Sequence, residues 1–260
     1  EEWLQTEWPD LKVWCNSVSE YWATVTISGP FARALLGELC SDLDISNEAM
    51  PFMSWREATV AGIAARIFRI SFTGEISYEI NVPASWGMAL WQALMTAGEK
   101  YGITPYGTET MHVLRAEKGY IIVGQETDGT MTPFDLDMEW IVSKKKPDFI
   151  GKRSLSRPDF LRDDRKQLVG LLTENPQEVL PEGAQIVDDP AAAIPMPMIG
   201  HVTSSYMSTS LGRSIALAVV KGGLSRTGEM VHLPLQDGRT VKAEISGTVF
   251  YDPEGERLNG

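Results

Sequence analysis

Apolar and polar side chains alternate along residues 76–82, which read Ile-Ser-Tyr-Glu-Ile-Asn-Val. A period of two residues is typical of a strand with one buried face and one polar face. The Thr-Gly pair at 73–74 separates this run from the strand before it, because glycine accepts a positive φ. The pattern places Glu79 in mid-strand on the polar face and Tyr78 on the apolar face.

Similar patterns predict further elements in the first half of the chain. Strands are expected over residues 22–27, 57–61 and 63–70, and amphipathic helices over residues 30–40, 86–101 and 107–118. Gly62 lies between two of these strands and predicts a hairpin there. The order of the elements resembles a split βαβ unit, in which helices cover an antiparallel sheet, so the fold class is α+β.

The pattern changes at residue 167, where short apolar runs alternate with Gly, Pro and Asp. Six strands are predicted, at residues 168–172, 184–187, 199–203, 215–220, 230–233 and 241–245. Regularly spaced short strands are typical of a small β-barrel. We therefore predict an α/β domain over residues 1–134, a helical linker over 135–166 and a C-terminal six-stranded β-barrel over 167–260.

The composition of the chain limits the kinds of molecule that it is expected to bind. The chain has 260 residues and a net charge of −12, which argues against nucleic-acid binding because no basic field attracts phosphates. No apolar run reaches the roughly 18 residues of a membrane span, and no signal peptide is recognisable, so a cytoplasmic protein is expected. The two cysteines, Cys15 and Cys40, fit either free thiols or a disulfide.

Few residues stand out as candidates for chemistry. The sequence contains no paired-Cys metal motif, no P-loop and no dinucleotide fingerprint, so neither a metal site nor a catalytic residue is predicted. Glu79 is either an ordinary solvated carboxylate or, if its face lines a pocket, a fixed acceptor for ligand N–H groups. Arg115, on a largely apolar helix, either pairs with an acid such as Glu117 or Glu79, or holds a ligand carboxylate through its rigid fork.

Several motifs, in order and spacing along almost the whole chain, resemble the aminomethyltransferase family, the T-protein of glycine cleavage. They lie at residues 28–30 (SGP), 71–80 (SFTGEISYEI), 114–119 (LRAEKG), 148–152 (DFIGK), 200–204 (GHVTS) and 211–218 (LGRSIALA). Residues 51–57 and 250–253 resemble the branch of the family that occurs in alpha subunits of heterotetrameric sarcosine oxidase.

The resemblance implies an aminomethyltransferase folate-binding fold and a tetrahydrofolate site. It implies that Glu79 binds the pterin, that Arg115 lies near the folate, and that Phe72 and Tyr78 belong to the same folate-binding set. Phe72 stands where the family usually has tyrosine, which removes a hydroxyl but keeps an apolar wall. In sarcosine oxidases, folate captures the carbon released from sarcosine as 5,10-methylenetetrahydrofolate, and flavins and NAD bind elsewhere in a complex with other subunits.

The family domain begins with a further segment that carries its catalytic aspartate, and this chain starts after that segment. The resemblance therefore predicts an N-terminally truncated domain, with an exposed sheet edge that favours dimerisation. Two other functions remain open: a non-catalytic scaffold that docks flavin subunits, and a T-protein-like aminomethyltransferase. The amine donor is not predicted.

Overall fold

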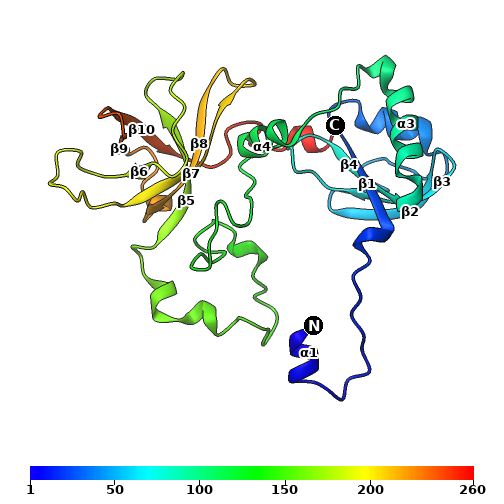
Figure 1. Cartoon of the computed structure of the whole chain (residues 1–260), viewed down its shortest axis with the longest axis horizontal. Coiled ribbons are helices and arrows are strands. Elements are labelled where there is room, and N and C mark those ends of the chain that lie inside the picture. The colour runs from blue at the N-terminus through cyan, green and yellow to red at the C-terminus, as the bar shows by residue number, and fades with distance from the viewer. The chain divides into compact units, whose positions relative to one another are not determined.

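The computed structural model describes residues 1–260, which form two compact units (Figure 1). The N-terminal unit comprises Glu1–Ser71, Glu75–Pro105 and Arg257–Gly260, and the barrel unit comprises Phe72–Gly74 and Tyr106–Glu256. The first unit thus ends near residue 105, not at the predicted domain end at 134. The reason is that the helix that follows packs on barrel strands, where Ala116 joins a cluster with Leu168 and Leu217.

The N-terminal unit is built on a four-stranded antiparallel sheet with the order β1-β4-β3-β2. Its strands are β1 (Trp22–Ser28), β2 (Ser54–Val60), β3 (Ile63–Arg69) and β4 (Ser77–Pro83). The predicted hairpin is confirmed, because Val60 pairs with Ile63 and both turn residues, Ala61 and Gly62, have positive φ. β1 and β2 form the two edges of this sheet.

Two helices cover one face of this sheet, as the apolar spacing predicts. They are α2 (Ala32–Leu39) and α3 (Gly87–Gly98), and both contribute leucines to a core that includes the apolar side chains of β4. The remaining helical segments are short: α1 (Glu2–Thr6), η1 (Ser19–Tyr21), η2 (Ala84–Trp86) and η3 (Glu99–Tyr101). Within the unit, the opposite face of the sheet carries no helix.

The six predicted barrel strands are all present. They are β5 (Lys166–Thr173), β6 (Gln185–Ile186), β7 (Gly200–Ser208), β8 (Arg213–Lys221), β9 (Met230–Pro234) and β10 (Thr240–Ser246). Their order is β6-β7-β8-β5-β10-β9, and a bridge between Val187 and His232 brings the two ends of the sheet together. The interior is apolar and holds alternate residues of each strand, such as Val169, Leu171 and Val220.

The segment before the barrel differs from the predicted helical linker. The helix α4 (Thr108–Glu117) is as expected, but the helical segments of residues 135–166, before β5 begins at Lys166, are only three 3₁₀ turns: η4 (Glu139–Ile141), η5 (Ser154–Ser156) and η6 (Pro158–Leu161). Pro147, Pro158 and a left-handed Gly151 interrupt the backbone here, so no α-helix forms. Two further 3₁₀ turns are η7 (Gly223–Ser225) and η8 (Glu256–Leu258).

Both cysteines are free thiols, so the disulfide alternative is not realised. Cys15 is exposed, whereas Cys40 is buried beneath the sheet. Burial raises the pKa of the Cys40 thiol to about 11, and the nearby Asp42 carboxylate adds to the effect. None of the helices combines the length and the hydropathy needed to cross a membrane.

Candidate functional site

Glu79 lies at the centre of β4, on the face of the sheet that the helices leave open. Its neighbours across the sheet are Thr26 on β1 and Phe68 on β3. The side chain is half-buried, yet its carboxylate has no hydrogen-bond or ion-pair partner. Burial raises the pKa of Glu79 because the charged form loses water that no protein group replaces.

Aromatic side chains flank Glu79 on the same face. Phe68 stacks on Trp55 of the edge strand β2, with 5.9 Å between ring centroids and 22° between planes. The guanidinium of Arg66 lies 4.7 Å from the ring centroid of Trp22. A carboxylate acceptor beside flat aromatic surfaces is suited to a planar ligand that presents N–H groups at one edge.

Tyr78 belongs to the other face of β4, as alternation requires. It is fully buried in the core of the N-terminal unit, and its hydroxyl accepts a hydrogen bond from Nε of Arg33 at 3.3 Å. Tyr78 and Glu79 are therefore neighbours in sequence that point in opposite directions. The position of Tyr78 favours holding the strand in place over direct contact with a ligand.

Arg115 and Phe72 belong to the barrel unit, unlike Glu79 and Tyr78. Phe72 is partly exposed, which fits an apolar wall. Arg115 is fully buried, and its Nη1 forms an ion pair with Glu126 at 2.8 Å. Of the two alternatives for Arg115, the structure therefore shows an ion pair, but the partner is neither Glu117 nor Glu79.

The Arg115–Glu126 pair is part of a buried polar network. Nη2 of Arg115 donates to the hydroxyl of Ser204 at 2.6 Å, and this hydroxyl donates in turn to Glu126. Glu126 also accepts from the backbone N–H of Ile122 at 2.7 Å and from the Thr203 hydroxyl at 3.2 Å. Of the three guanidinium nitrogens of Arg115, only Nε is buried without a hydrogen-bond partner.

Sequence reasoning did not single out Glu126. It occurs in the polar loop at residues 124–131, between other acids and glycines, and this composition is typical of a solvated turn. The available signal was an arginine on a largely apolar helix, because an arginine that such a helix buries requires an acid. Glu117, the expected partner, instead accepts hydrogen bonds from Ser208 at 2.6 Å and Ser210 at 3.0 Å. No group of three or more His, Cys, Asp or Glu side chains is placed to hold a metal ion.

The lack of a partner for Glu79 predicts a pH-dependent stability. Since its pKa is raised in the folded state, folding loses free energy as pH rises from the ordinary glutamate pKa through the raised value. We expect Glu79→Gln to raise the melting temperature modestly at pH 7, and the difference to vanish near pH 3, where both side chains are neutral. Differential scanning calorimetry between pH 3 and pH 7 measures this difference in melting temperature. A lower melting temperature for Glu79→Gln at pH 7 would show that the carboxylate has a stabilising partner.

Comparison with known proteins identifies the fold. Residues 1–146 match the GCVT N-terminal domain, and residues 166–252 match the glycine cleavage T-protein C-terminal barrel domain. Among solved structures, the glycine cleavage system aminomethyltransferase T from Bartonella henselae has a TM-score of 0.73 and 25% identity, covering 89% of this chain and 60% of that one. The fold is thus that of the aminomethyltransferases.

The chain belongs to the glycine cleavage T-protein family of enzymes. It is 54% identical, over its whole length, to the sarcosine oxidase subunit alpha of Corynebacterium sp. (strain P-1), and 42% identical, over 98% of its length, to that of Rhizobium meliloti. It spans 27% and 26% of these two subunits. The aminomethyltransferase of Thermotoga maritima is 28% identical, over 96% of this chain and 65% of that protein.

Proposed function

We propose that the chain is the tetrahydrofolate-binding, one-carbon-transfer part of a sarcosine oxidase alpha subunit. In this role it captures the carbon of sarcosine as 5,10-methylenetetrahydrofolate. The observation that carries the proposal is the half-buried Glu79 carboxylate, which has no partner in the protein and faces an open, aromatic-flanked surface. The identity of 54% to a sarcosine oxidase alpha subunit supports the choice of complex.

The residues of the open face fit a pterin. A pterin presents N–H groups along one edge of a planar ring, and Glu79 offers an ionised acceptor that these groups can satisfy. The stacked pair of Phe68 and Trp55 offers a flat apolar surface beside it. Bound tetrahydrofolate would supply the nitrogen that takes up the one-carbon unit.

The other residues of the predicted site have different proposed roles. Arg115 and Phe72 remain proposed folate-site residues of the barrel unit. Because Arg115 is fully buried, its proposed part is to hold the loop of Glu126 rather than to contact the ligand. Tyr78 acts by fixing β4 from the core side, where it is bonded to Arg33. No residue of this chain is proposed as catalytic.

Isothermal titration of the whole chain with tetrahydrofolate tests the proposal. Glu79→Gln should weaken binding about tenfold or more, because a hydrogen bond to a charged acceptor contributes about 1.5–3 kcal/mol. Glu57→Gln is the matched control, since Glu57 lies on the same face but is exposed and ion-paired with Arg66 at 3.3 Å. Equal affinities of wild type and Glu79→Gln would remove Glu79 from the site. The absence of binding to wild type would remove the folate function and favour a scaffold that docks flavin subunits.

The second candidate is aminomethyl transfer from a carrier protein, as in T-protein. Its support is that the chain covers 65% of the length of aminomethyltransferases, against 27% of the sarcosine oxidase subunit. An assay with aminomethylated carrier protein separates the two donors. For the first candidate we propose a cytoplasmic complex in which the other subunits and the rest of the alpha subunit hold the flavins and NAD.

A further inference from the structure

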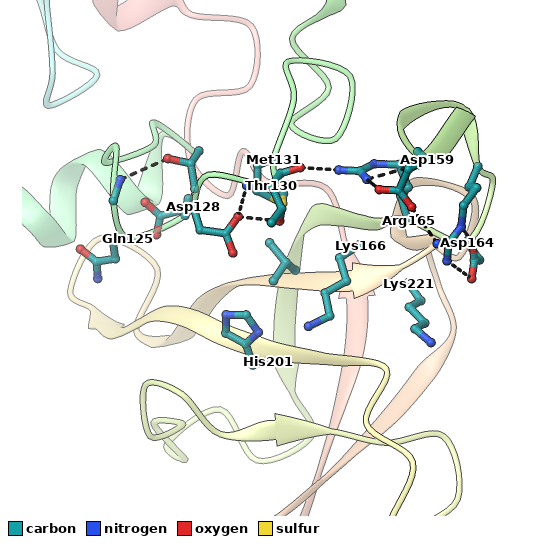
Figure 2. A pocket seen from close by; sticks show the side chains of 15 residues that line it. Gln125, Asp128, Thr130, Met131, Asp159, Asp164, Arg165, Lys166, His201 and Lys221 are labelled. Atoms are coloured by element: carbon teal, nitrogen blue, oxygen red, sulfur yellow. Dashed lines mark hydrogen bonds and ion pairs between the residues drawn. The ribbon is translucent and has the colours of Figure 1, made fainter. Parts of the chain in front are cut away.

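A cavity of about 470 Å³ lies in the barrel unit, apart from the residues assigned to folate (Figure 2). Its floor is the outer face of the barrel sheet, where Lys166 of β5, Lys221 of β8 and His201 of β7 line it. Its opposite wall is the loop that carries Asp128 and Thr130. In Figure 2, the three basic side chains lie below this loop.

The two lysines are direct cross-strand neighbours, since Lys166 pairs with Lys221 in the antiparallel ladder of β5 and β8. Directly opposed like charges destabilise a strand pair. Neither ammonium group forms a hydrogen bond or an ion pair with any acid of the chain. The floor of the cavity therefore carries two ammonium groups whose N–H donors have no hydrogen-bond partner in the protein, although Asp128 attracts Lys166 and Asp164 attracts Lys221 through space.

The acids at the rim form no direct hydrogen bond with these lysines, and arginines bind the carboxylates of Asp159 and Asp164. Arg162 binds both carboxylate oxygens of Asp164, at 2.7 and 2.8 Å, and reaches Asp159 at 2.9 Å. Arg165 binds both carboxylate oxygens of Asp135 in the same way, at 2.8 and 2.7 Å. Two forked arginine–carboxylate pairs therefore occupy the oxygens of Asp164 and Asp135, so that neither oxygen pair is free to accept a direct hydrogen bond from a lysine.

His201 supplies a third donor on the floor. Its ring makes no hydrogen bond, and burial together with the Lys166 charge lowers the pKa of the imidazole. The neutral ring keeps one N–H that can point into the cavity. Asp128, on the opposite wall, accepts hydrogen bonds from the backbone N–H and the hydroxyl of Thr130 at 2.7 and 2.6 Å, which lowers its pKa and keeps it ionised.

We propose that this cavity binds a phosphate group, either inorganic phosphate or the phosphate of a small monoester. Lys166 and Lys221 supply two charges that match a dianion, and His201 supplies an N–H to a third oxygen. Ammonium groups hold phosphate as point charges, and a dianion between opposed lysines also relieves their repulsion. The carboxylate of Asp128 on the far wall weakens the site and limits how deep an anion sits. The proposal does not depend on the proposed function.

Titration of the whole chain with inorganic phosphate and with glycerol 3-phosphate, at constant ionic strength set by chloride, tests the site. Isothermal titration gives the affinity, and the imidazole NMR signals of His201 report the location. Lys166→Met and Lys221→Met should each weaken binding roughly tenfold, as expected for the loss of a charge-assisted hydrogen bond. Asp128→Asn should tighten phosphate binding, because it removes a negative charge from the opposite wall. Lys145→Met, an exposed lysine outside the cavity, is the matched control and should change nothing.

The outcomes separate the proposal from its rivals. Saturable binding that shifts the His201 signals and depends on Lys166 and Lys221 supports it. It is overturned by no saturation up to about 10 mM, by equal losses in Lys145→Met and Lys166→Met, or by glutarate binding as tightly as phosphate. Retention of phosphate binding in Glu79→Gln shows that the cavity and the proposed folate site are separate.

Discussion

Replacing Arg115 with methionine should lower the free energy of unfolding by about 3–5 kcal/mol, because Glu126 would become a buried carboxylate without a counter-ion. Both side chains are fully buried, and the Nη1–Oε2 distance is 2.8 Å. Removal of the guanidinium also leaves the Ser204 hydroxyl and the carbonyl of Tyr120 without this donor. Urea unfolding of the whole chain, followed by circular dichroism, measures the change.

Two further variants make this result specific. Lys144→Met removes an exposed ion pair with Glu139 and should cost well under about 1 kcal/mol. The double variant Arg115→Met with Glu126→Leu should recover part of the loss, since no charge is then buried alone. If Arg115→Met changed stability no more than Lys144→Met does, the Arg115–Glu126 pair would not be the anchor of α4 on the barrel.

Replacing Gly200 with alanine should cost about 3 kcal/mol, the upper part of the range for an overpacked site. A Cβ at this position would lie 2.1 Å from the carbonyl oxygen of Val219 and 3.0 Å from Cα of Val220. Both atoms belong to the backbone of β8, which pairs with β7 at this point. Neither can move away without breaking ladder hydrogen bonds. Thermal unfolding of the variant measures the effect.

Gly107→Ala is the control for this substitution. Gly107 has an extended backbone with φ of −90°, and a Cβ there would meet no atom within 4 Å. Its replacement by alanine should change the free energy of unfolding by less than about 1 kcal/mol. Similar melting temperatures for Gly200→Ala and Gly107→Ala would contradict the prediction, because they would mean that β7 and β8 accommodate the added Cβ at no cost.

Alternation along single strands was sufficient to predict much of the fold. Residues 76–82 form β4 with the predicted apolar face in the core, and all six barrel strands lie where short apolar runs occur. These predictions hold because burial on one face imposes a period of two, which the sequence records directly. The 3₁₀ turns of residues 135–166 leave no such periodic record, so the predicted helical linker was wrong in its secondary structure.

The contacts of the candidate site could be predicted only where they depend on a single element. Alternation assigns Tyr78 and Glu79 to opposite faces, and the structure places them so. The partner of Arg115 could not be read in this way, because Glu126 reaches it from a loop and Ser204 from a barrel strand. Contacts between separate elements depend on tertiary packing, which has no local pattern in the sequence.

The strand order of the barrel also determines when it can fold. β5 is the first barrel strand in the chain, yet its neighbours are β8 and β10, which come much later. During synthesis β5 therefore has no partner until most of the barrel has been made, and pairing over such long sequence separations is slow. The last strand, β10, is required to enclose the first. Loss of the C-terminal strands would leave β5 with an open edge, and a nascent barrel is vulnerable to misassembly until that edge is covered.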